Sequence, residues 1–72
     1  MQRFDAHALY LALDEQRTKE GLSWQQVAER IGVSVATLRR TQKGGRLEVD
    51  GTLAMVGWLR LPIEHFVRET GR

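Results

Sequence analysis

Apolar residues recur at helical spacing from the first residues of the chain. Within residues 5–20 they form a stripe that consists of Ala8, Leu9, Ala12 and Leu13. Such a stripe is typical of a helix that buries one face. Asp5 stands at a suitable N-cap position, and Gly21 can end the helix in a left-handed conformation. The pattern therefore predicts a helix over Asp5–Glu20.

Two shorter helical patterns follow, at residues 23–31 and 34–42, separated by the corner Gly32-Val33-Ser34. Ser23 is expected to cap the first of them, with Gln26 at the position that a capping box requires. Ser34 is expected to cap the second, which points Leu38 inward. The apolar face of the first helix comprises Val27, Ala28 and Ile31. Two helices joined by a short glycine-containing corner are the signature of a helix-turn-helix.

The remaining third of the chain predicts two more helices. Asp50 is the expected N-cap of a helix over residues 51–60, where Gly57 suggests a close approach to another helix. Pro62 suits the first position of a fifth helix over residues 62–70, whose apolar face would comprise Ile63, Phe66 and Val67. Residues 44–46 are expected to form an exit loop and residues 71–72 a frayed tail. No stretch alternates as a strand does, so the prediction is an all-α, compact bundle of about five short helices in a single domain, residues 1–72.

Charge is concentrated in one part of the chain. The net charge is +2, but residues 34–46 alone carry +4 and contain no acid, whereas the flanking segments 1–33 and 47–72 each carry −1. The four cations are Arg39, Arg40, Lys43 and Arg46. A local excess of this kind is the footprint expected of a surface that binds a polyanion.

Other classes of function find little support in the residues. The chain has no cysteine, His7 and His65 lack metal-ligand spacing, and the adjacent carboxylates Asp14 and Glu15 would not face each other on a helix. We therefore expect no enzyme activity, no metal and no cofactor. No apolar run is long enough for a signal peptide or a membrane span, so the expected location is the cytoplasm of a bacterial or phage-infected host, with the nucleoid.

Several short motifs, taken in order, resemble the Cro and phage-repressor (XRE) family of helix-turn-helix domains. They are residues 17–23 (Arg-Thr-Lys-Glu-Gly-Leu-Ser), Val27-Ala28, residues 31–34 (Ile-Gly-Val-Ser), Thr37-Leu38, Lys43-Gly44 and residues 58–66. The resemblance extends over about residues 9–67 and implies a lambda-repressor-like fold whose second motif helix, residues 34–42, enters the major groove of DNA.

The resemblance also implies which residues contact DNA. The positions that match base-contacting residues of the family are Arg40, Arg39, Ala36 and Val35. Arg40 is the best candidate for direct readout, because a guanidinium can bond O6 and N7 of guanine together. Val35 and Ala36 can offer only apolar contact to thymine methyl groups. The expected contacts to the DNA backbone come from Ser23, Gln25, Thr37, Lys43 and Arg46.

Three positions depart from the family pattern. Family members often form an ion pair between an arginine at the position of Arg17 and a glutamate at the position of Gln42. A neutral glutamine cannot form this ion pair, but its side-chain carbonyl can still accept a hydrogen bond. Thr41 replaces a large apolar residue. Each of these two changes is expected to loosen the end of the second motif helix by about 1 kcal/mol. Trp24 stands where the family often has a backbone-contacting glutamine, and it either packs on the first helix or contacts the DNA backbone.

The leading hypothesis is a sequence-specific regulator of double-stranded DNA, a small Cro-like repressor of phage or mobile-element type. A module this small would need a homodimer on a pseudo-palindromic operator, and the candidate dimer patch consists of Trp58, Leu61 and Ile63. The alternative is a protein-interaction module, an antitoxin or anti-regulator that keeps the fold and binds a protein partner. Neither hypothesis involves a membrane or a small-molecule substrate.

Overall fold

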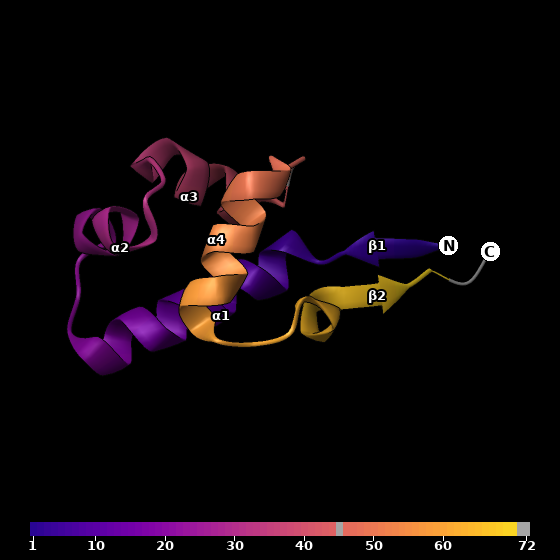
Figure 1. Ribbon diagram of the computed structural model, residues 1–72, viewed down its shortest axis with the longest axis horizontal. Helices are drawn as coiled ribbons and strands as arrows, with labels where there is room; N and C mark the ends of the chain where they lie inside the picture. Colours follow the sequence, from indigo (N-terminus) through magenta and orange to yellow (C-terminus); the bar gives the residue numbers. More distant parts are fainter. Residues whose placement is uncertain (45, 71–72) are drawn as a thin grey trace.

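A small antiparallel sheet pairs a strand that precedes the helices in the sequence with a strand that follows them (Figure 1). In the computed structural model, which describes residues 1–44 and 46–70, the order is β1 (Gln2–Phe4), α1 (Ala6–Glu20), α2 (Trp24–Ile31), α3 (Val35–Lys43), α4 (Val49–Leu59), a 3-10 helix η1 (Ile63–Phe66) and β2 (Val67–Glu69). The predicted helical bundle with a central helix-turn-helix is confirmed.

The four α-helices share one core. Its buried residues are Leu9, Leu13, Leu22, Val27, Ala28, Leu38, Met55, Val56 and Phe66. Helix α1 is the centre of the packing, because it contacts α3, α4 and η1. Leu9 and Leu13 on the predicted stripe are completely buried. In Figure 1, α4 crosses α1, and α2 and α3 lie together on one side of both.

The predicted helix ends of the motif are confirmed. The side chain of Asp5 accepts a hydrogen bond from the backbone N–H of Ala8, and Gly21 ends α1 in the left-handed conformation. Ser23 and Gln26 form the reciprocal capping box of α2, Gly32 ends α2 with φ 89°, and Ser34 caps α3. These local hydrogen bonds fix the corner between α2 and α3, since they satisfy the backbone groups that a helix end leaves unpaired.

Predictions for α4 are partly wrong. Helix α4 begins two residues early, after Glu48, so that Asp50 lies in its first turn rather than at its N-cap. Leu53, an apolar residue of this helix, is 52% exposed. Gly57 is exposed, and a Cβ built there would meet nothing within 4 Å, so no close helix approach explains it. The earlier start shows that the N-cap preference of Asp50 did not decide where this helix begins.

The predicted fifth helix and the predicted absence of strands are also wrong. Residues 63–66 form a single 3-10 turn, and the chain then continues as β2, which pairs with β1 in the register Phe4 with Val67 and Gln2 with Glu69. Phe66 is buried, with its ring 5.9 Å from that of Phe4. The core position of Phe66 and the pairing with β1 hold Val67–Glu69 extended. Gly45 of the predicted exit loop and the predicted tail at residues 71–72 lie outside the described residues.

Candidate nucleic-acid interface

Helix α3 has a buried side and an opposite side exposed to solvent. Leu38 and Thr41 face the core, and their exposed fractions are 2% and 0%. Four exposed residues follow the spacing i, i+3, i+4 and i+7, which places them on one helix face. They are Ala36, Arg39, Arg40 and Lys43, and we call them the α3 face.

The cations of the α3 face are not neutralised within the described part of the chain. Arg39 and Lys43 form no ion pair with residues 1–44 or 46–70, whereas three other arginines do: Arg17 with Asp14, Arg30 with Glu20 and Arg68 with Asp5. Uncompensated cations on one helix face produce a positive potential there. This face therefore has the electrostatics suited to a polyanion.

The guanidinium of Arg40 is held by a neighbour one turn earlier. Its Nη2 donates to Oγ1 of Thr37 at 3.3 Å, and the hydroxyl of Thr37 also lies 3.0 Å from Oγ of Ser34. The bond directs the guanidinium toward the N-terminal end of α3. Thr37, predicted to contact a phosphate, thus positions Arg40 here. The sequence contained the i, i+3 spacing of this pair, which is the signal that could have identified it.

Val35 differs from the other predicted base-contacting residues. It is half-buried and packs against the core, at the side of α3 next to α1 and α2. There it lines a hollow of about 210 Å³ together with Tyr10, Trp24, Leu38, Arg39 and Gln42. Val35 lies beside the α3 face, at its border with this hollow.

The predicted backbone-contacting residues lie at three separate places. Ser23 and Gln25 are exposed at the start of α2, where N–H groups of a helix N-terminus favour an anion. The Oγ of Ser23 accepts the cap bond from Gln26, which leaves its O–H available to donate. Lys43 belongs to the α3 face. Arg46 is exposed after the end of α3 and lines a different hollow, together with Arg3 of β1.

Trp24 packs within the protein. Its ring stacks on Tyr10 with centroids 5.0 Å apart and an interplanar angle of 17°. On the same ring, the guanidinium carbon of Arg17 lies 4.9 Å from the centroid. Aromatic stacking and a cation over a ring both stabilise this arrangement. Of the two alternatives for Trp24, the structure shows the packed one.

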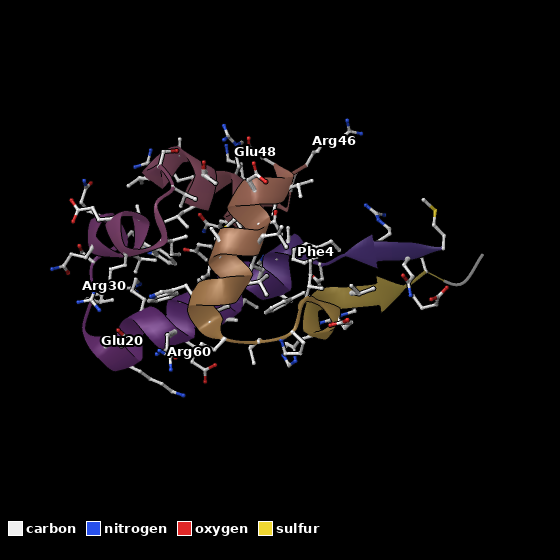
Figure 2. The ribbon with its side chains drawn as sticks, viewed as in Figure 1. Phe4, Glu20, Arg30, Arg46, Glu48 and Arg60 are labelled. Carbon is white, nitrogen blue, oxygen red and sulfur yellow. The ribbon has the colours of Figure 1, made fainter. Side chains whose placement is uncertain are left out.

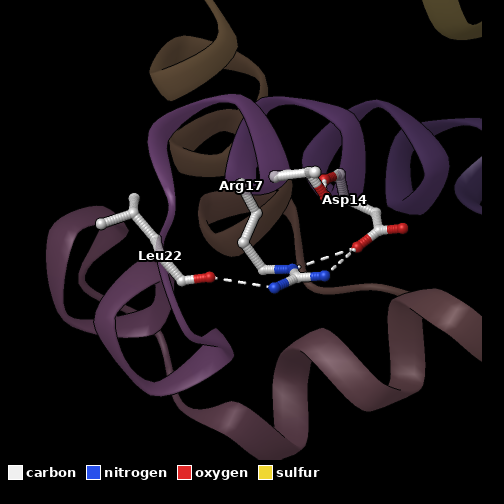
Figure 3. Close-up of polar contacts among 4 residues, drawn as sticks. Asp14, Arg17 and Leu22 are labelled. Atoms are coloured by element: carbon white, nitrogen blue, oxygen red, sulfur yellow. Dashed lines mark hydrogen bonds and ion pairs between the residues drawn. The ribbon is translucent and has the colours of Figure 1, made fainter.

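Arg17 joins α1 to the start of α2 without Gln42 (Figure 3). Its Nε and Nη2 donate to Oδ1 of Asp14 at 3.0 and 2.7 Å, and its Nη1 donates to the carbonyl oxygen of Leu22 at 2.9 Å. Gln42, which the sequence left as a possible acceptor, receives no hydrogen bond from Arg17 within the described residues, and Asp14 on the preceding turn supplies a carboxylate. In the sequence, Asp14 was considered only beside Glu15, so its contact with Arg17 was missed, although the i, i+3 spacing of the pair was a signal for it.

Thr41 is accommodated in the core. It is completely buried, and its hydroxyl donates to the carbonyl oxygen of Thr37 at 2.9 Å and lies 3.6 Å from the sulfur of Met55. A buried hydroxyl is costly only when it lacks a partner. The polar group of Thr41 is therefore satisfied at the end of α3.

Comparison with known proteins bears on the same part of the chain. A family model described as Helix-turn-helix matches residues 13–41, which run from the second half of α1 to near the end of α3. This segment is a Cro/repressor-type (XRE) helix-turn-helix. Motifs of this type bind DNA through their second helix, so the match supports a DNA-binding role for this segment. Searches of curated proteins and of solved structures found no match.

The contacts that position the α3 face all lie within the helix-turn-helix segment. The capping box of α2, the Gly32 corner and the Arg17 contacts all lie within the matched segment. Across residues 1–44 and 46–70, no helix is both long and apolar enough to cross a membrane.

Proposed function

We propose that the protein is a small Cro-like transcriptional repressor that binds specific sequences of double-stranded DNA. In this proposal, α3 enters the major groove. The observation that carries the proposal is the α3 face, where Arg39, Arg40 and Lys43 project from one side of the second motif helix with no acid among them. Arg40 reads guanine through its two terminal nitrogens, and Arg39 reads a base or binds a phosphate.

The neighbouring elements support this arrangement. The start of α2 offers the hydroxyl of Ser23 and the amide of Gln25 to the phosphates, and Lys43 and Arg46 do so from the other end of α3. Val35 and Ala36 contribute apolar contacts to thymine methyl groups, Val35 from the border of the face. With so few base contacts, DNA shape supplies part of the specificity.

A single domain of this size buries about 600–1,000 Å² on DNA, which limits its affinity. We therefore propose that the operator is pseudo-palindromic and that two copies occupy half-sites about one helical turn apart. Selection from a random duplex library tests both statements, because it reports the preferred sequence and its symmetry together. A selected consensus without a repeated half-site would contradict the dimeric mode of binding.

The test of the α3 face is the double variant Arg39→Ala/Arg40→Ala, titrated against the selected duplex by fluorescence anisotropy at several salt concentrations. We expect at least a 100-fold loss of affinity and a salt slope that is shallower by at most about 0.9, because Arg39 is the one candidate phosphate contact of the pair. The matched control is Lys19→Ala/Arg60→Ala, which removes the same charge from exposed positions on α1 and after α4.

Two outcomes would overturn the proposal. If both double variants lose the same affinity, binding depends on net charge alone and α3 is not the reading element. If the parent protein binds no duplex at low salt, the protein-interaction alternative becomes the better account of this helix-turn-helix.

A further inference from the structure

Helix α4 has two unfavourable backbone positions near its C-terminal end. Gly57 lies inside the helix, where glycine is destabilising, and a Cβ built there would meet nothing within 4 Å, so packing within the described residues does not account for it. Arg60 follows the helix with φ 59°, the left-handed conformation that glycine adopts at the ends of α1, α2 and α3. It is the one residue other than glycine with a positive φ in the described part of the chain. Unfavourable backbone positions of this kind are frequent at functional sites.

Both positions lie in the same hollow, which we call the Gly57 hollow. It has a volume of about 720 Å³ and lies between the second half of α1, the end of α2 and the end of α4. Its lining residues are Gln16, Glu20, Arg30, Gly57, Trp58, Leu59 and Arg60. In Figure 2, Glu20, Arg30 and Arg60 lie near one another at the lower left, away from the start of α4. A glycine in the wall of a hollow allows the main chain of another molecule to approach the helix closely.

The polar groups of the Gly57 hollow leave donors available and not acceptors. The carboxylate of Glu20 is bound on both oxygens, because Nη1 of Arg30 donates to Oε1 at 3.2 Å and Nε2 of Gln16 donates to Oε2. The other nitrogens of Arg30 donate to no described residue. The guanidinium of Arg60 forms neither a hydrogen bond nor an ion pair with the described part of the chain. Guanidinium groups have no acceptor atoms, and their strongest partners are carboxylates and phosphates.

The lining of the Gly57 hollow is typical of a contact with another protein. Small-molecule pockets are mostly apolar, whereas four of the seven lining residues here carry a charged or an amide side chain. Trp58 is half-buried and lines the hollow next to the arginines. Tryptophan and arginine are the residues in which the binding energy of protein interfaces is concentrated. The chemistry therefore favours a peptide that supplies carboxylates.

Trp58 also belongs to the dimer patch expected from the sequence, whose three residues lie at different places. Trp58 and Leu61 are partly buried and pack against the core, whereas Ile63 is 38% exposed. Ile63 lines a separate hollow near β1 and the start of α4. Of the three residues, Trp58 alone lines the Gly57 hollow.

We propose that the Gly57 hollow binds an acidic segment of a partner protein. The main chain of the segment lies over Gly57, and an apolar side chain of the segment packs on Trp58. Its carboxylates bind Arg30 and Arg60. The proposal goes beyond DNA binding and does not depend on it, because α3 contributes no residue to the hollow. In Figure 1, α4 runs away from α3, so that its end lies far from the α3 face.

Peptide selection tests the chemistry of the partner. A phage-displayed library of short random peptides is selected on the immobilised full chain without DNA, and individual labelled peptides are then titrated by fluorescence anisotropy. We expect the selected peptides to be enriched in aspartate and glutamate next to an apolar residue. Their dissociation constants should be about 10–100 µM, because a short flexible peptide loses conformational freedom on binding.

Gly57→Ala separates binding from folding. The added methyl group has room in the free chain and favours the helix, so the melting temperature should rise by about 3–6 °C. The same methyl group lies where the main chain of the peptide approaches, so peptide affinity should fall at least about fivefold. A purely structural role of Gly57 would not give a more stable chain that binds peptide more weakly.

Arg60→Ala tests the charge of the hollow and should weaken peptide binding at least about tenfold. The matched control is Arg3→Ala, which removes the same charge from an exposed position on β1 that does not line the Gly57 hollow. It should change the affinity less than about twofold. Circular dichroism checks that each variant remains folded.

Four results would overturn the proposal. The library yields no peptide that binds below about 1 mM, or the selected peptides are not enriched in acidic residues, or Gly57→Ala and Arg60→Ala bind them as tightly as the parent does. The fourth is that sodium acetate, compared with sodium chloride at the same ionic strength, displaces a peptide at about the concentration of the free peptide. That result would assign the hollow to a small carboxylate. Duplex binding is measured separately, so a failure of either proposal leaves the other standing.

Discussion

Helices α3 and α4 each pack one side against the shared core, but the side chains that they expose to solvent differ in character. Each buries one side in the shared core, through Leu38 and Thr41 on α3 and through Met55 and Val56 on α4. The outer side of α3 is cationic, whereas α4 exposes Val49 and Leu53 next to Asp50. Burial therefore explains where both helices lie, and only the exposed residues distinguish the cationic surface of α3 from the partly apolar surface of α4.

The first prediction compares the truncation of a buried leucine on α3 with the truncation of an exposed leucine on α4. Leu38→Ala should lower the free energy of unfolding by about 3 kcal/mol, because it deletes a fully packed side chain and leaves a cavity. Leu53→Ala should change it by less than about 0.5 kcal/mol. Urea denaturation at low micromolar protein concentration measures both.

Domains of this size have few kilocalories to lose, so Leu38→Ala should also abolish duplex binding under conditions where the parent is folded. Equal losses in the two variants would mean that Leu53 belongs to the core in solution, which would contradict its 52% exposure.

The second prediction separates two cations within the α3 face. Arg40→Ala should cost about 1–3 kcal/mol at the operator and relax the preference at one base pair, because a bidentate contact to guanine is lost. Lys43→Ala should weaken all duplexes alike and reduce the salt slope by about 0.9. Competition titrations with operator duplexes changed at one base pair measure the difference.

The control for this pair is Thr37→Val, which keeps Arg40 and removes the hydroxyl that holds its Nη2. We expect a smaller loss in the same base-pair preference. If Arg40→Ala and Lys43→Ala weaken all sequences equally, Arg40 contacts a phosphate and the readout assigned to it is wrong.

The two helices also differ in how well the sequence predicts them. Helix caps depend on residues that are close in the sequence, so the caps formed by Ser23 with Gln26 and by Ser34 were predicted, and the structure confirms both. The start of α4 at Val49 was not predicted, because Asp50 is a stronger N-cap signal than Glu48, which makes no side-chain cap bond. Strands β1 and β2 were missed since each has three residues and its partner lies more than sixty residues away.

For the candidate site, the sequence predicted the composition of the α3 face and not its surroundings. Charge counting identified Arg39, Arg40 and Lys43, and helical spacing alone brings them together. The contacts of Arg17 with Asp14 and Leu22, and the placing of Val35 beside Trp24, depend on how α1 packs against α2 and α3. The exposure of Leu53 depends on how α4 packs against α1 and α2, which the spacing of its apolar residues does not show.

The third and smallest prediction compares the ends of the two helices. Both end in a left-handed residue, Gly44 with φ 75° after α3 and Arg60 with φ 59° after α4. A side chain in this conformation costs about 1–2 kcal/mol, and glycine in the unfolded chain offsets part of the gain through its greater freedom. Arg60→Gly should therefore raise the free energy of unfolding by about 0.5 kcal/mol, and Gly44→Ala should lower it by about 1 kcal/mol. Thermal unfolding followed by circular dichroism measures both variants. A loss of stability in Arg60→Gly would show that the side chain of Arg60 stabilises the end of α4 by more than its backbone conformation costs.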